Sequence, residues 1–189
     1  MFPCQIPGHD LVIERLAPYS GLYVEDGSNE ELSDVAMLLI RNTGSQPVEY
    51  TQIVITYPSQ TLQFYLSALP GGESAVVQER SRLPLPQEKP TNASALVVER
   101  TEMAIAPEIS VTDNGDNTLT VTNLTDKDIP TVRIFYKYYM EEENLFVGGI
   151  AFTVKLNRLG ANKSLVVQPA HYTSQNSKIV MVLTYDTVQ

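Results

Sequence analysis

An internal repeat of β-rich sequence constrains the fold of this 189-residue chain more than any other feature. The segment Val35–Tyr57 aligns without gaps onto Asp116–Tyr138 at an offset of 81 residues. The segment Leu66–Gln78 then aligns onto Leu156–Gln168 at an offset of 90 residues. Because order, polarity and turn positions agree in both blocks, the sequence favours two copies of one small β-domain over a single large fold. Chance similarity between β-rich segments is the alternative interpretation.

The two copies differ in length at two places. The change of offset places nine extra residues in the second copy, in a hairpin around Glu141–Asn144. A third block, Leu96–Val98, aligns onto Val180–Val182 at an offset of 84. The first copy is therefore longer before that block, in the proline-rich stretch Leu83–Pro90.

Short apolar runs with two-residue periodicity cover most of the chain, and none keeps a helical period over three turns. We expect the long run 145–156 to be interrupted near Gly148 and Gly149. Turn sequences such as Asn114-Gly115 separate the runs. The predicted strands are Leu11–Leu16, Val35–Arg41, Tyr50–Tyr57, Thr61–Leu66, Ser74–Glu79, Ala95–Arg100, Glu108–Thr112, Thr118–Asn123, Thr131–Tyr139, Leu145–Leu156, Ser164–Gln168 and Lys178–Tyr185.

This pattern predicts an all-β protein made of two tandem antiparallel immunoglobulin-like β-sandwiches. The N-terminal sandwich covers residues 1–104, with a leading strand and the proline-rich loop. The C-terminal sandwich covers residues 107–189, with the hairpin insertion. The linker around Ile105–Pro107 is short, so we expect a fixed or weakly hinged tandem.

Two turn motifs carry a family resemblance. The stretch Ile40–Val48 ends a strand in Asn-Thr-Gly and opens the next behind Pro-Val, and Leu69–Ser74 reads Leu-Pro-Gly-Gly-Glu-Ser. This combination resembles the FxLYD family of Gram-positive lipoproteins and surface proteins and related immunoglobulin-like modules. The resemblance implies a bacterial, extracytoplasmic module without catalytic residues or a cofactor.

The charge of the chain limits the classes of binding partner, and its cysteine content limits the covalent cross-links. The chain has 13 Lys and Arg against 22 Asp and Glu, a net charge of −9. Thirteen of the acidic residues and six of the basic ones lie in residues 1–106, so a cationic partner would prefer this half. The acidic balance argues against nucleic-acid binding and anionic membrane surfaces. One cysteine, Cys4, excludes an intramolecular disulfide.

The localisation expected from the resemblance is extracytoplasmic, either secreted or in the cell envelope. It assumes a leader outside this sequence, since residues 1–8 carry neither a basic region nor an apolar stretch of signal length. A cytoplasmic protein is the alternative. No apolar run is long enough to span a membrane.

The sequence suggests one weak metal site. Asp113, Asp116 and Asn117 crowd oxygen ligands that suit calcium, although the spacing is not that of an EF-hand. Asn114-Gly115 between two strands is also a strong signal for a hairpin turn, and we favour the turn. The acidic stretch 25–31 gives a similar choice between a cation-binding loop and a solvated loop, and we expect the solvated loop.

The candidate interaction residues lie in and beside the hairpin insertion. Glu141, Glu142 and Glu143 form its tip, where a scaffold commonly carries binding. Tyr136 and Tyr138 could stack on a sugar if their rings were exposed, whereas tyrosines alternating in a strand are usually half-buried. The predicted function is a non-enzymatic structural or interaction module with an unknown protein or glycan partner. The alternative is a carbohydrate-binding accessory module that uses exposed tyrosines.

Overall fold

The computed structural model describes residues 2–28 and 30–187 and is all-β within them, without any helix. The strand pattern follows from local alternation of the residues, since buried positions alternate with exposed or partly exposed ones, as in Thr61–Leu69. The strands are β1 (Cys4–Gln5), β2 (Leu11–Tyr23), β3 (Glu30–Asn42), β4 (Val48–Thr56), β5 (Thr61–Leu69), β6 (Ser74–Gln78), β7 (Asn92–Arg100), β8 (Ile109–Asp113), β9 (Leu119–Asn123), β10 (Ile129–Met140), β11 (Leu145–Leu159), β12 (Ser164–Val167) and β13 (Ser177–Tyr185).

Each of the twelve predicted strands overlaps one of β2–β13, and the two-residue β1 is an addition. One detail of the prediction is wrong. The run that begins at Leu145 is not interrupted at Gly148 and Gly149 but continues as a single strand of 15 residues. Gly148 has a φ of 93°, a value that favours glycine, so the chain bends there without leaving the sheet.

The strands form three sheets of seven, three and three strands, and the chain divides into two compact units. Unit 1 contains residues 1–102 and 140–150, and unit 2 contains residues 103–139 and 151–189. Residues 140–150, the hairpin that the sequence prediction groups with the C-terminal domain, therefore belong to unit 1.

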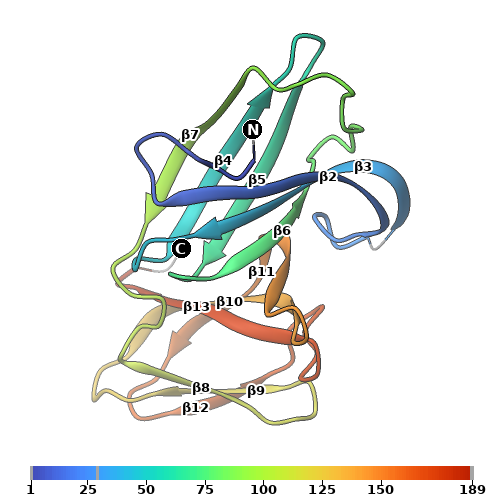
Figure 1. Ribbon diagram of the computed structural model, residues 1–189. Helices are drawn as coiled ribbons and strands as arrows, with labels where there is room; N and C mark the ends of the chain where they lie inside the picture. The colour runs from blue at the N-terminus through green and yellow to red at the C-terminus, as the bar shows by residue number, and fades with distance from the viewer. Residues whose placement is uncertain (1, 29, 188–189) are drawn as a thin grey trace. The chain divides into compact units, whose positions relative to one another are not determined.

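Unit 1 contains two sets of three antiparallel strands, in the orders β2-β3-β6 and β5-β4-β7 (Figure 1). Its core draws fully buried side chains from both sets, among them Leu38, Ile40, Ile53, Ile55 and Phe64. Burial of each such side chain stabilises the fold by about 1.5–3 kcal/mol.

Unit 2 repeats this arrangement with β8-β9-β12 and β11-β10-β13. Its core is one cluster of buried residues from both sets, including Leu119, Val121, Ile134, Leu156 and Val182. The strands β8, β9 and β12 lie side by side in Figure 1. In chain order, β8 to β13 correspond to β2 to β7.

Two pairings depart from the antiparallel arrangement predicted from the sequence. The start of β11 pairs in parallel with β6, through Phe146 opposite Ala75 and Val147 opposite Val76. In unit 2, Ile105 forms an isolated parallel bridge with Val182. Both additions lie at the outer edge of a three-stranded set.

Two asparagines at the predicted offset of 81 make corresponding hydrogen bonds in the two units. In unit 1 the Asn42 Nδ2 donates to the carbonyl oxygens of Gln46, Leu69 and Pro70 at 2.9–3.3 Å. In unit 2 the Asn123 Nδ2 donates to the carbonyl oxygens of residues 127, 159 and 160 at 2.8–3.1 Å. These acceptors are related by the offsets of 81 and 90 that the sequence alignment predicts.

The backbone follows the same correspondence. The N–H of Asn42 donates to the Glu73 carbonyl, and that of Asn123 donates to the Lys163 carbonyl, both at 2.9 Å. Positive φ values occur at Ala68 and at its counterpart, residue 158, which precede the turn in each unit. The two units therefore share their strand order and the hydrogen bonds of this turn.

Candidate functional site

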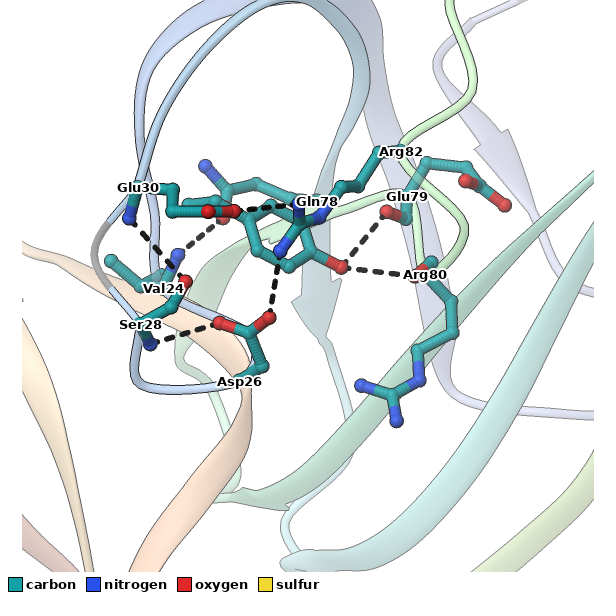
Figure 2. Close-up of polar contacts among 9 residues, drawn as sticks. Val24, Asp26, Ser28, Glu30, Gln78, Glu79, Arg80 and Arg82 are labelled. Atoms are coloured by element: carbon teal, nitrogen blue, oxygen red, sulfur yellow. Dashed lines mark hydrogen bonds and ion pairs between the residues drawn. The ribbon is translucent and has the colours of Figure 1, made fainter.

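The loop between β2 and β3 carries a cluster of polar contacts (Figure 2). The Arg82 guanidinium donates to two carboxylates. It donates to Asp26 in the loop at 2.9 Å and to Glu30, the first residue of β3, at 2.7 Å. Its Cζ lies 4.7 Å from the ring centroid of Tyr23. Hydrogen bonds from Ser28 and the nearby Arg82 hold the pKa of Asp26 below its usual value. The cluster closes the loop over the end of β2.

The Tyr23 hydroxyl extends the cluster toward the segment after β6. It donates to the carbonyl oxygens of Glu79 and Arg80 at 3.2 and 3.0 Å (Figure 2). Burial of the ring, followed by the charge of Glu25, raises the pKa of the Tyr23 hydroxyl. Tyr23 is therefore a neutral donor that fastens two backbone carbonyls, and its ring is not available to a ligand because it is 1% exposed.

Glu25 joins three parts of unit 1. Its carboxylate accepts the backbone N–H of Gln78 at 2.8 Å and that of Gly149 at 2.8 and 3.0 Å from its two oxygens. The expectation of a solvated loop at 25–31 is wrong for Glu25, which is 9% exposed. Asn29 of that stretch lies outside the described residues. Burial of a carboxylate is tolerated here because backbone N–H groups surround it.

Glu79 is a second buried carboxylate with a similar role. It accepts the backbone N–H groups of Gln63, Ser81 and Leu83 at 2.7–3.1 Å. Its neighbour Gln78 accepts the N–H of Val24 at 2.8 Å through its side-chain oxygen. These buried polar groups therefore hold loops to strands.

A groove of about 440 Å³ lies elsewhere in unit 1. Three carboxylate side chains and one guanidinium line it, those of Glu14, Glu73, Glu143 and Arg41. Of the predicted interaction residues, Glu143 is the one that lines this groove. An excess of carboxylates at an open groove favours cationic groups on a ligand.

The tip of the hairpin insertion is exposed at Glu141, Glu142 and Glu143, between the end of β10 and the start of β11. The structure brings Glu143 to the same groove as Glu73, which belongs to the turn before β6. The insertion and that turn are 70 residues apart in the chain, so their proximity comes from the β6–β11 pairing. A role in binding stays a prediction for these three residues.

The proposed calcium ligands lie in the turn between β8 and β9. Asp113 accepts hydrogen bonds from the Ser174 and Tyr172 hydroxyls at 2.6 and 2.9 Å. Partial burial raises the pKa of Asp113, but the hydrogen bonds from Ser174, Gly115 and Tyr172 outweigh it and hold the pKa below its usual value. The side-chain oxygens of Asp113 thus fasten this hairpin to the loop before β13.

The other two proposed ligands are also hydrogen-bonded within the protein. Asp116 accepts the hydroxyl and the N–H of Thr118, which lower its pKa. Asn117 accepts the N–H of Ser174 at 3.0 Å. Over residues 2–28 and 30–187, no group of three or more His, Cys, Asp or Glu side chains is placed to hold a metal ion. Calcium binding stays an untested prediction.

The two predicted tyrosines belong to an aromatic cluster in unit 2. Tyr136 is 1% exposed, and its hydroxyl donates to the carbonyl of Ala170. Its ring centroid lies 5.9 Å from that of Phe152 and 5.4 Å from that of Tyr172. Tyr138 is partly exposed and contacts Phe152 edge-on at 5.5 Å. Tyr136 therefore offers no open ring face to a sugar, whereas Tyr138 is partly exposed.

Sequence reasoning missed Glu25 and its partner Gly149 as structural residues. One signal for Gly149 was present, because a glycine inside a strand often marks a close approach of another backbone. A Cβ at position 149 would lie 1.9 Å from the carbonyl oxygen of Tyr65. The burial of Glu25 had no comparable signal, since the residues that follow it, Asp26 to Glu31, are polar or glycine.

The fold and these contacts define an all-β protein of two units with corresponding strand order. No protein-family model matches the chain, and neither a curated protein nor a solved structure shows significant similarity to it. In the part of the chain that the structure describes, no helix has the length and apolarity needed to cross a membrane.

Proposed function

We propose that this chain is a non-enzymatic structural or interaction module of a bacterial secreted or cell-envelope protein, built as two tandem immunoglobulin-like β-sandwiches. The observation that carries the proposal is the correspondence between the Asn42 and Asn123 hydrogen-bond networks at the offsets of the sequence repeat.

The strand order supports the immunoglobulin-like part of the proposal. Counted from β2 in unit 1 and from β8 in unit 2, the first, second and fifth strands form one set, and the third, fourth and sixth form the other. In an immunoglobulin-like Greek key, strands A, B and E form one set and strands C, C′ and F the other, so this order agrees with the proposal. The apolar cluster between the two sets in unit 2 supplies the packed core that such a sandwich requires.

The use of polar residues supports a scaffold rather than a reaction centre. The buried carboxylates of Glu25 and Glu79 accept backbone N–H groups, and the buried amides of Asn42 and Asn123 donate to backbone carbonyls. Such bonds stabilise loops and strand ends. The exposed hairpin tip and the acidic groove with Glu143 are then surfaces that a rigid scaffold presents.

The test is protease accessibility in the native bacterium. Intact cells are treated with trypsin, and the released peptides are identified by mass spectrometry. We expect peptides from cleavage in the exposed segment after β6, which contains Arg80 and Arg82, while a ribosomal protein of the same cells stays protected. Protection of this chain until the cells are lysed would refute an envelope location.

A further inference from the structure

The outer edges of β6 and β12 occupy corresponding places in the two units. Ala75 of β6 pairs with Ile40, and Leu165 of β12 pairs with Val121. Ile40 and Val121 are related by the offset of 81, and Ala75 and Leu165 by the offset of 90. The two edges can therefore be compared residue by residue.

The edge of β6 is covered by another strand. Residues 146 and 147 at the start of β11 pair in parallel with Ala75 and Val76. Ala75 is fully buried, and Phe146 is 4% exposed. Gly149 lets the added strand approach closely, and the Glu25 carboxylate accepts its N–H. Unit 1 thus shows which kind of segment fits this edge: an extended apolar strand with glycine at its end.

The corresponding edge in unit 2 is open among the described residues, where β12 is the last strand of its sheet. Leu165 and Val166, the counterparts of Ala75 and Val76, are 46% and 60% exposed. Leucine therefore stands exposed at the position where the covered edge has alanine. The strand Ser164–Val167 also contains none of the charged or proline residues with which proteins usually block an edge.

We propose that the edge of β12 is a docking site for an extended apolar strand of a partner polypeptide, which adds in parallel as residues 146 and 147 add to β6. The partner segment has the chemistry of Leu-Phe-Val-Gly-Gly-Ile: alternating apolar side chains for the exposed Leu165 and Val166, and glycine where two backbones meet. Backbone hydrogen bonds to the free edge supply affinity, and the apolar side chains supply selectivity. This inference names the interaction surface of the module and rests on the function proposed above.

The experiment titrates a capped peptide of residues 142–151 into the isotope-labelled full chain and follows the backbone amides by NMR. We expect saturable binding with the largest shifts at residues 164–167. Val166→Lys places a charge on the exposed edge and should weaken binding at least tenfold. A peptide with Val147→Pro, which lacks one N–H donor and resists the strand conformation, should bind at least tenfold more weakly.

The matched control is Leu96→Lys, which changes an apolar residue of β7 that is 63% exposed and lies in unit 1. This variant should bind the peptide like the unmodified chain. If Val166→Lys loses its dispersed amide spectrum, Leu165→Lys takes its place.

Three outcomes overturn the inference: no binding at millimolar peptide, shifts centred on β7 or another edge, or concentration-dependent self-association through β12 without peptide. Each leaves the proposed envelope location to be judged by protease accessibility, so the two failures are distinguishable.

Discussion

The carboxylate of Glu25 accepts the backbone N–H of Gly149 at 2.8 Å, although the two residues are 124 positions apart in the chain. This hydrogen bond fastens the start of β11 to unit 1, beside the N–H of Gln78 that the same carboxylate accepts. The hairpin insertion of the second copy is thereby held in the first unit. The stability of the hairpin should depend on the carboxylate of Glu25 and on the absence of a side chain at Gly149.

Replacing Glu25 with glutamine should loosen the hairpin. In the unmodified chain, backbone N–H groups donate to both oxygens of the Glu25 carboxylate. Glutamine replaces one of these oxygens with an NH₂ group, which cannot accept a hydrogen bond. We expect a loss of about 2 kcal/mol in unfolding free energy. Amide hydrogen exchange at Gly149 should become faster by at least tenfold. Glu31→Gln, at an exposed position near the start of β3, is the control and should change neither quantity. Unchanged exchange at Gly149 would contradict the assigned role of Glu25.

Gly149→Ala should be more damaging. The added Cβ would lie 1.9 Å from the Tyr65 carbonyl oxygen and 2.6 Å from the Val77 Cγ1, so this part of β11 must move away from β5 and β6. We expect a loss of roughly 3 kcal/mol or more in denaturant unfolding. Gly160→Ala is the matched control, since its Cβ would meet the flexible Lys163 side chain at 3.2 Å. Equal stability of the two variants would show that β11 does not approach so closely.

Asn42 and Asn123 should contribute similar amounts to the free energy of unfolding. Asn42→Ala and Asn123→Ala each remove a buried amide and leave three carbonyl oxygens without this donor. We expect each substitution to cost about 2–4 kcal/mol of unfolding free energy. Asn157→Ala, at an exposed position of β11, should cost less than about 0.5 kcal/mol. A large effect at one asparagine with none at the other would argue against corresponding turns in the two units.

Tyr136 should make the chain sensitive to alkali. Burial, with a smaller effect of Tyr138, raises the pKa of Tyr136 to about 12 from an ordinary 10.0. A raised folded-state pKa contributes stability that is fully present below pH 10 and is lost as the pH rises toward 12. Tyr136→Phe lacks this titration and the hydrogen bond to Ala170.

The variant should therefore be less stable by about 1 kcal/mol at pH 8. Its deficit relative to the unmodified chain should shrink between pH 10 and 12. Urea unfolding of both proteins at pH 8, 10 and 11 measures the difference. A deficit that grows with pH would mean that the hydroxyl is not protected in the folded state.

The sequence by itself determined the strands and the repeat. Alternation of apolar and polar residues is a local property, and turn residues such as those after Asn42 set the chain reversals locally, so the positions of β2–β13 followed from short windows. The carbonyl oxygens to which Asn42 and Asn123 donate are also related by the offsets of 81 and 90 found in the sequence. The strand continuity through Gly148 was missed, because glycine can either end a strand or bend it.

Tertiary structure alone decided which edges are covered and which carboxylates are buried. The sequence that begins at Leu145 predicts a strand but not its pairing partner. Nothing in its pattern favours pairing with β6, 70 residues earlier, over pairing with any other strand edge. Glu25 looks solvated in sequence, because its burial requires N–H donors from Gln78 and Gly149 that only the folded chain supplies. Alternation of apolar and polar residues determines which face of a strand is buried. Pairing at the edges of a strand uses backbone N–H and C=O groups, which are the same in almost every residue, so the pairing cannot be predicted from local sequence.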